Sequence, residues 1–340
     1  MIRVAEWPHD GAAWDAFVGR SPDGRIMHLY GWKAVMERAY GHRTHYLGAW
    51  EGDELRGVLP LTLVRGLVVG RSLVSMPYMD YGGVCGPGHD KAERALVEAA
   101  VDLARRHRAS LVLRYARRPE LDLPCSLEKV TMYLQLGTSE EALWKSLPSE
   151  RRNRIRKGQK LGLVASVHGP EGLPEFYAVF AENMRDLGSP VHSRRFFEEV
   201  MRHLPDHTKI LLVRSDGQPI GAALMLLHGG MISSPWISSL RSAFEKCPNQ
   251  VLYWEMMRFG LANGFPVLDF GRSSQDSGTF EAKRQWRPEP VQMYWFYSPV
   301  DARPPGEDVK RLSWAVGLWR RLPLPLANLA GPRLRRSIPN

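Results

Sequence analysis

The residues best suited to chemistry follow the apolar stretch PVL (266–268). Asp269 comes next, at the end of what we expect to be a buried strand. A buried carboxylate is costly unless a partner compensates its charge, and Arg272 and Lys283 are the candidate partners. One interpretation is a structural ion pair that closes a loop. The other is a site carboxylate whose charge state a cation tunes, with Arg272 as a substrate-binding residue.

Six of the ten residues from 151 to 160 are Lys or Arg. On a helix, residues four apart such as Arg152 and Arg156 share one face, where unpaired like charges repel. One interpretation is a solvated helix that links two domains. The other is contact with the phosphates of a donor or acceptor, which arginine suits well. The candidate phosphate contacts are Arg152, Asn153, Arg156 and Lys157.

A third candidate segment is MPYMDYGGV (76–84), where Asp80 and Tyr81 precede two glycines. Adjacent glycines allow positive φ angles and a close approach of a ligand. A tight turn around a packed tyrosine is the alternative. Asp80 and Tyr81 are therefore candidates for an acceptor cleft.

The elements that must position these residues occur twice along the chain. IRVAE (2–6) and LVASV (163–167) are 161 residues apart, and so are VTMYLQL (130–136) and VQMYWFY (291–297). Each half also carries a hairpin signal with Gly and Asp at its turn. Equal offsets over several elements predict an internal duplication.

Helical segments recur at matching places in the two halves. We expect helices at about 11–19, 30–40 and 91–108 in the first half, and at about 171–187, 193–204 and 249–263 in the second. Short apolar strands follow the third helix of each half, LVLRYA (111–116) and PVLDFG (266–271). This alternation predicts an α/β fold, with mixed sheets covered by helices.

The order of elements is that of the GCN5-related N-acetyltransferase (GNAT) fold, and two such units in one chain resemble the FemAB-like acyltransferases. Three stretches carry the resemblance: SERRNRIRKGQKLGL (149–163), PNQVLYWEMMRFGLANGFPVLDFGRS (248–273) and GTFEAKRQWRPEPVQ (278–292). The tail LWRRLPLPLANLAGPRLRR (318–336) is similar to that of FemAB-related proteins associated with exopolysaccharide and exosortase systems.

The resemblance implies a role for Lys283. In the family, a lysine at the matching position stabilises the oxyanion of the acyl-transfer intermediate, although here Ala282 replaces the usual aromatic residue before it. Losing one such donor costs roughly 10²–10³ in rate. Asp269 or Glu281 would assist deprotonation of the attacking amine. An exposed helix lysine is the alternative.

The segment before the helix at 249–263 bears on the identity of the acyl donor. A GNAT enzyme that uses acetyl-CoA holds the pyrophosphate with a glycine-containing loop at a helix N-terminus. The corresponding stretch, ISSLRSAFEKCPNQ (237–250), has no glycine. This favours aminoacyl-tRNA, the donor common in the resembling family, and leaves an acyl-CoA open. We expect no tightly bound cofactor.

The helix near 249–263 supplies further candidates. We expect Asn249 to cap the amides of residues 251–252 and Trp254 to face the core. Tyr253 faces either the core or the cleft. Trp236, Asn249 and Tyr253 are taken as substrate-binding residues.

The residues at the family's acceptor-binding motif differ in this sequence. Members that bind a nucleotide-linked peptidoglycan precursor show W-x-x-V-K, whereas here Trp32 is followed by Met36 at the lysine position. We therefore expect a different amine, such as an amino sugar of an exported polysaccharide.

Composition narrows the function classes. Of 340 residues, 46 are Lys or Arg and 36 are Asp or Glu, a net charge of +10 that predicts an anionic partner. Three scattered cysteines and isolated histidines give no metal site or disulfide framework, and a helix-turn-helix or zinc-finger pattern is missing. The N-terminus lacks a secretory signal and no apolar run spans a membrane, so we expect a cytoplasmic protein.

The C-terminal tail has two interpretations. Residues 309–340 hold seven Lys or Arg and no acidic residue, and tryptophans and leucines interleave with them. This suits contact with the inner face of the membrane, and a tail packed back on the first domain is the alternative. We expect Pro323 and Pro325 to break the amphipathic helix.

Together these patterns predict four parts: a first GNAT-like domain (1–147), a basic linker helix (148–162), a second GNAT-like domain (163–300) and the tail (301–340). The predicted function is transfer of an aminoacyl or acyl group to an amine of a cell-envelope or exopolysaccharide component. The alternatives are an acyl-CoA-dependent N-acetyltransferase and a non-catalytic module that binds RNA or another polyanion.

Overall fold

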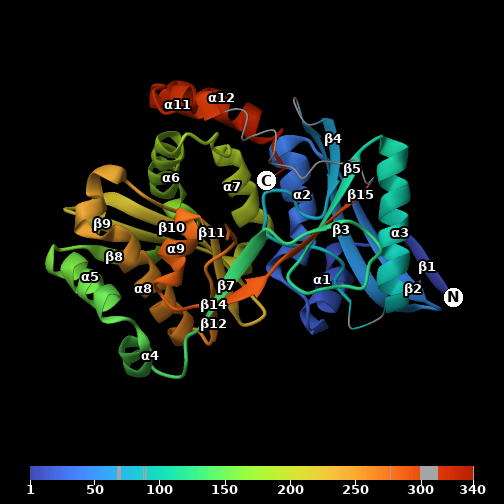
Figure 1. The fold of residues 1–340 in the computed structure, drawn as a ribbon, viewed down its shortest axis with the longest axis horizontal. Coiled ribbons are helices and arrows are strands. Elements are labelled where there is room, and N and C mark those ends of the chain that lie inside the picture. The colour runs from blue at the N-terminus through green and yellow to red at the C-terminus, as the bar shows by residue number, and fades with distance from the viewer. Residues whose placement is uncertain (67–69, 87, 89, 276, 299–312, 340) are drawn as a thin grey trace.

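The computed structural model describes residues 1–66, 70–86, 88, 90–275, 277–298 and 313–339. Each half of the molecule contains one mixed β-sheet, and helices cover both sheets (Figure 1). The predicted α/β class is confirmed.

The first half follows the predicted order of strand, two helices, three strands, helix and strand. Its elements are β1 (Ile2–Glu6), α1 (Gly11–Arg20), α2 (Gly31–Tyr40), β2 (Arg43–Glu51), β3 (Glu54–Gly66), β4 (Gly70–Val74), α3 (Asp90–His107) and β5 (Ser110–Tyr115). The leucine and alanine stripe of α3 packs on the sheet to form a core of its own.

The second half repeats that order. Its elements are β8 (Val164–His168), α6 (Leu173–Leu187), α7 (Arg194–His203), β9 (Thr208–Ser215), β10 (Gln218–His228), β11 (Met231–Ser239), α8 (Pro248–Ala262) and β12 (Val267–Asp269). The predicted hairpin is present: Asp216 and Gly217 both have positive φ, at 51° and 78°, as a tight two-residue turn requires.

The two strands that close the halves are exchanged. The sequence repeat puts β7 (Lys129–Gln135) at the end of the first half, yet β7 pairs with β12, with Tyr133 opposite Asp269. Conversely, β15 (Tyr294–Ser298) pairs with β5, with Phe296 opposite Leu113. Each of the two closing strands therefore completes the sheet of the other half. The predicted domain boundaries stay a prediction, but the sheets do not follow them.

Smaller strands complete the sheets. They are β6 (Cys125–Ser126), which pairs with β15, and β13 (Ser273–Ser274) and β14 (Glu289–Gln292), which both pair with β7.

One of the hydrophobic cores is built from residues of both halves. Helices α2 and α7 pack together at the centre of the molecule (Figure 1). Gly31 makes this approach possible, because a Cβ there would lie 2.4 Å from the carbonyl oxygen of His203. The indole rings of Trp32 and Trp236, one from each half, are 6.5 Å apart. The geometry between the halves is thus set by close packing.

The connecting and terminal helices lie outside the sheets. They are α4 (Glu140–Ser146), α5 (Ser149–Lys160), α9 (Gly278–Arg284), α11 (Ser313–Trp319) and α12 (Leu324–Arg335). The expected break of the tail helix is confirmed: α11 ends at Trp319 and a separate helix, α12, begins at Leu324 directly after Pro323, with Pro325 in its first turn, where a missing N–H is tolerated. The tail packs back on the protein, and α12 contacts α6. No described helix is long and apolar enough to cross a membrane.

Candidate active site

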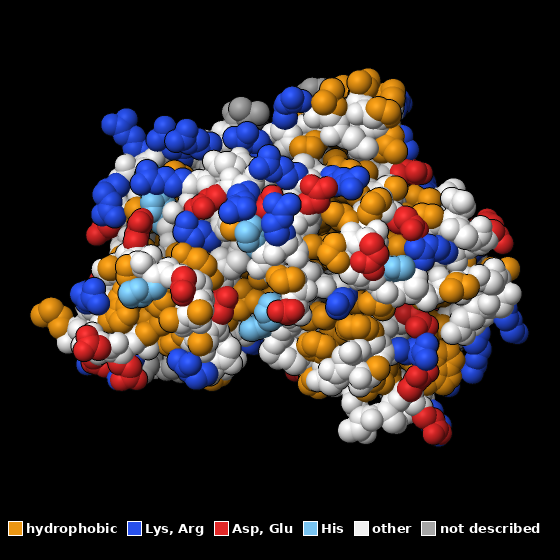
Figure 2. Space-filling model, turned by 180° about the vertical axis from the view of Figure 1, so that it is seen from behind, with side chains coloured by type: hydrophobic (Ala, Val, Ile, Leu, Met, Phe, Trp, Pro, Cys, Tyr) orange, Lys and Arg blue, Asp and Glu red, His pale blue; other side chains and the backbone are white. Residues whose placement is uncertain are grey.

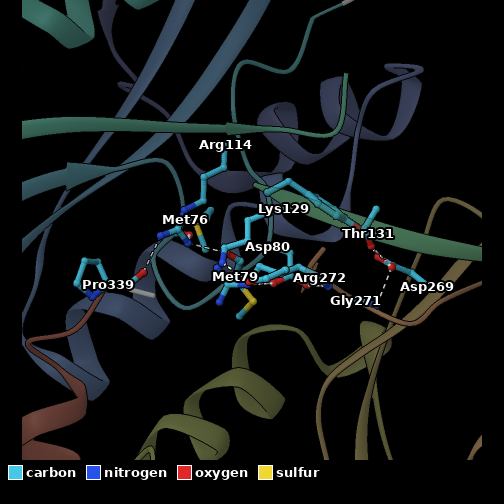
Figure 3. Close-up of polar contacts among 12 residues, drawn as sticks. Met76, Met79, Asp80, Arg114, Lys129, Thr131, Asp269, Gly271, Arg272 and Pro339 are labelled. Atoms are coloured by element: carbon cyan, nitrogen blue, oxygen red, sulfur yellow. Dashed lines mark hydrogen bonds and ion pairs between the residues drawn. The ribbon is translucent and has the colours of Figure 1, made fainter. Parts of the chain in front are cut away.

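The centre of the site is Asp269, the last residue of β12. Its side chain is buried and accepts hydrogen bonds from the Thr131 hydroxyl (2.6 Å) and the Gly271 amide (2.8 Å) (Figure 3). It accepts a third hydrogen bond from the Tyr81 hydroxyl. Burial raises the pKa of Asp269, and the hydrogen bonds oppose that shift. The expected pairing of Asp269 with Arg272 or Lys283 is wrong, because neutral donors surround the carboxylate.

Arg272 pairs instead with Asp80 of the first half. One Asp80 oxygen accepts from the Arg272 amide at 2.9 Å, and the other lies 3.2 Å from the guanidinium Nε (Figure 3). The guanidinium also stacks on the indole of Trp295 at 5.1 Å, and Arg114 stacks on the same ring at 4.4 Å. A loop of the first half is thereby tied to the end of β12.

Lys283 projects from α9 toward the same loop. Its Nζ donates to the carbonyl oxygens of Gly271 and Arg272, both at 2.9 Å. Burial lowers the pKa of Lys283 to about 8, while the negative charges of Asp80 and Asp269 oppose that shift. An ammonium has three N–H groups, so these two bonds leave one for an oxygen of a bound substrate.

Gly271 allows this arrangement. Its φ is +72°, and a Cβ at this position would lie 3.1 Å from a carboxylate oxygen of Asp80. Both the backbone conformation and the space favour glycine, so the turn after β12 can approach the Asp80 loop closely.

The sheet opens beside these residues. β11 and β12 pair in parallel only as far as Ser233 and Asp269, after which β11 continues alone to Ser239. β11 also carries an extra residue between Ser233 and Trp236, where its register with β10 shifts. Bulges and diverging strand ends are common beside ligand sites.

Comparisons with known proteins fit this geometry. The family model for the acetyltransferase (GNAT) domain matches residues 149–284. The structure of FemX is similar with a TM-score of 0.68 and 14% identity, over 86% of this chain and 96% of that one. Residues 149–284 thus match a GNAT domain, and the chain as a whole shares the fold of FemX, with two GNAT-like units.

Two other solved structures resemble the chain. One is the C-terminal domain of a putative lysylphosphatidylglycerol synthetase from Agrobacterium fabrum, with a TM-score of 0.59 and 14% identity over 85% of this chain and 92% of that one. The other is a tandem GNAT protein from the clavulanic acid biosynthesis pathway, with a TM-score of 0.52 and 13% identity over 89% and 99%. At these identities the likeness concerns the fold. No protein of curated function matches the sequence.

The structure does not bring Glu281 to this site. Glu281 is exposed on α9 and pairs with Arg284 at 2.7 Å. Side chains two positions apart on a helix point in nearly opposite directions. Glu281 therefore faces solvent, while Lys283 faces Gly271. Asp269 is thus the one of the two predicted carboxylates that lies near Lys283.

The basic helix α5 lies against α8 of the GNAT domain. Ile155 and Gly158 face α8, and a Cβ on Gly158 would be 3.1 Å from the Lys246 carbonyl oxygen, just before α8 begins. Of the predicted phosphate contacts, Arg152 is half-buried and Asn153, Arg156 and Lys157 are exposed. The Arg156 guanidinium stacks on Trp144 at 5.1 Å.

Asn249 does not cap α8. The helix begins one residue earlier, at Pro248, and the Asn249 side chain accepts a hydrogen bond from the Ser239 hydroxyl at 2.8 Å. The capping position belongs to Cys247, which has a φ of +62°. Asn249 therefore links the start of α8 to the end of β11.

The predicted aromatic candidates lie in or against the cores. Trp236 is buried among Phe196 and Phe197, with ring centroids 5.4 and 5.2 Å away. Tyr253 packs on Phe270 at 4.8 Å, beside the turn that follows β12, and burial raises its pKa to about 12. The prediction that Trp254 faces the core is confirmed.

Sequence reasoning missed a small cavity between the halves. It has a volume of about 80 Å³ and includes Asp23, Arg25, His28, Tyr81, Arg117 and Tyr133 in its lining. Tyr81 thus borders the cavity and also donates to Asp269. No cluster of three or more His, Cys, Asp or Glu side chains suited to a metal ion occurs among the described residues.

Proposed function

We propose that this chain is an N-acyltransferase that moves an aminoacyl or acyl group onto an amine of a cell-envelope or exopolysaccharide component. The observation that carries the proposal is the Lys283 ammonium, held by two backbone carbonyls where β11 and β12 separate. A cation fixed beside a diverging pair of strands is suited to the negative charge that acyl transfer develops.

The proposed reaction is direct. The acceptor nitrogen attacks the carbonyl carbon of the donor, a C–N bond forms, and the ester C–O or thioester C–S bond breaks. Lys283 donates its remaining N–H to the carbonyl oxygen as it becomes negative. Asp269 takes up the amine proton through the Tyr81 hydroxyl, which donates to that carboxylate and borders the cavity, and the proton then passes to the departing oxygen or sulfur.

The donor is proposed to carry phosphates, with aminoacyl-tRNA favoured over acyl-CoA. The exposed cations of α5 lie on a helix packed beside the start of α8. The segment before α8 has no glycine, so it is poorly suited to wrap a pyrophosphate closely. FemX and the lysylphosphatidylglycerol synthetase domain, both similar in fold, support an aminoacyl donor and an acceptor of the cell envelope.

The acceptor is proposed to enter from the side of the first half, near Asp80 and the cavity beside Tyr81. The expected amine is that of an amino sugar or another envelope component, and the reaction takes place in the cytoplasm. Asp80, already paired with Arg272, gives that entrance a carboxylate that favours a cationic amine.

Mass spectrometry of small molecules that co-purify with the chain tests donor and acceptor together. An aminoacylated tRNA or its fragments would support the favoured donor, and CoA would support the acyl-CoA alternative. A nucleotide-linked amino sugar would identify the acceptor. Absence of acyl transfer from either donor to a panel of amines would contradict the proposal.

The second candidate function, a non-catalytic module for RNA or another polyanion, rests on the exposed cations of α5 and the net charge of +10. It predicts nucleic-acid binding that weakens steeply with salt. It also predicts that Lys283→Ala changes nothing measurable, whereas the acyltransferase proposal predicts a large loss of turnover.

A further inference from the structure

The helices α11 and α12 form a cap that presents leucines to solvent. Leu318, Leu326, Leu329 and Leu334 have side chains 59%, 53%, 61% and 38% exposed. Apolar side chains gather over this cap at the upper right of the rear view (Figure 2). Isolated exposed leucines are ordinary, but several on one short element indicate an interaction surface.

The opposite side of the cap is already packed. Ala327 and Gly331 of α12 are buried, and a Cβ on Gly331 would lie 2.9 Å from a methyl group of Val191. Val316 of α11 packs equally closely on Gly188, at the end of α6. Since these contacts fix the inner face, the leucines are held outward by the fold.

Arginines accompany the exposed leucines. Arg320 donates to the carbonyl oxygen of Leu187, another exposed leucine, at 3.4 Å. Arg333 donates to the carbonyl oxygen of Leu329 at 3.2 Å. The sequence from 309 to 340 contains no Asp or Glu. The surface of this cap therefore combines apolar side chains with positive charge only.

We propose that the cap docks on a membrane surface that contains anionic lipids. Leucines enter the boundary between headgroups and acyl chains, and arginines bind the headgroup phosphates while their stems cover apolar surface. The alternative is a protein partner with an acidic, apolar groove. It is less favoured, because several cations surround the apolar surface and a layer of anionic lipid headgroups can pair with all of them at once. This inference does not depend on the proposed acyl transfer.

Sedimentation of the full chain with vesicles tests the proposal. Vesicles of phosphatidylcholine with one quarter phosphatidylglycerol are compared with pure phosphatidylcholine. We expect binding to the anionic vesicles at least tenfold tighter than to the neutral ones, and weaker in high salt. The double variant Leu326→Ser with Leu329→Ser is expected to lose at least tenfold in binding. Arg320→Glu with Arg321→Glu is expected to lose at least as much, because one cation near an anionic surface is worth about fivefold.

A matched control is the pair Leu127→Ser with Leu161→Ser, two similarly exposed leucines outside the cap. This variant should bind as the parent does, and circular dichroism checks that every variant is folded. Equal binding of the cap variant and the parent would overturn the proposal. Failure of the parent to bind anionic vesicles would overturn it as well. If size-exclusion chromatography then showed a dimer of the parent and a monomer of the cap variant, the surface would join two copies of the chain.

Discussion

The same strand position carries side chains of opposite charge in the two halves. LVLRYA in β5 corresponds to PVLDFG around β12, so that Arg114 stands where the second half has Asp269. Both side chains are buried. Arg114 donates to the carbonyl oxygens of Met79 (2.6 Å) and Pro339 (2.9 Å), whereas Asp269 accepts from hydroxyls and an amide.

The space beside these strands differs accordingly. In the first half, the chain leaves β4 and stays close to β5, since the amides of Gly82 and Gly83 bond the Arg114 carbonyl oxygen at 3.1 and 2.8 Å. In the second half, β11 leaves β12 after Ser233. The first half thus fills its own opening and presents Asp80 and Tyr81 to the second, where the chemistry is proposed. Duplication of a fold does not imply duplication of a site.

The sharpest test of this asymmetry is Lys283→Ala. We expect kcat to fall by roughly 10²–10³ with a smaller change in KM, because the lost N–H acts on charge that develops during the reaction. Steady-state kinetics with the identified donor and acceptor measure this. Unchanged kcat would remove Lys283 from the mechanism and leave the two halves chemically alike.

Arg114→Met tests the structural role of the first half. It leaves the carbonyl oxygens of Met79 and Pro339 without their buried donor, so we expect the free energy of unfolding to fall by about 2–3 kcal/mol. Urea unfolding measures it. Arg118→Met, at an exposed position close by, should change stability by less than about 0.5 kcal/mol. Equal effects would mean that Arg114 does not hold the loop.

Gly271→Ala compares the turns that follow the two strands. A residue with a side chain at φ +72° costs roughly 1–2 kcal/mol, and the added methyl group would displace Asp80 and lower turnover as well. The counterpart, Ala116→Gly, should cost less than about 1 kcal/mol through chain entropy alone. Thermal unfolding of both variants distinguishes the two turns; similar losses would contradict the strain assigned to Gly271.

The smallest effect concerns pH. Since burial lowers the pKa of Lys283 to about 8, the ammonium is lost as the pH rises through that value, and its contribution to kcat should be halved near pH 8. The acceptor amine becomes more reactive as it loses its proton at higher pH, which raises the rate of every variant. We therefore compare the parent with Lys283→Arg, whose side chain stays charged, and follow the ratio of the parent rate to the variant rate. We expect this ratio to fall between pH 7 and 9; a constant ratio would contradict a titrating Lys283.

The helices and strands could be predicted well from the sequence, and the pairing of the strands less well. The equal offsets located the strands and helices of both halves, because hydrophobic periodicity and turn residues act locally. Asp269 was recognised as a candidate from its place at the end of an apolar strand, and the role of Lys283 came from the resemblance to the FemAB-like family. Thr131 and Trp295 were missed because they reach the site only through the exchange of β7 and β15, which no local pattern encodes. The expected role of Asn249 failed for another reason: Pro248 began the helix one residue early.

The exchange of closing strands also limits how the chain can be recombined. If the chain were cut between β7 and β8, the first segment would lack β15, the strand that belongs beside β5, and the second segment would lack β7, the strand that belongs beside β12. Chimaeras with other proteins of this architecture must therefore be spliced crosswise, with residues 1–128 and 293–298 taken from one parent and residues 129–292 from the other. A single crossover at the midpoint would leave two mismatched sheet edges.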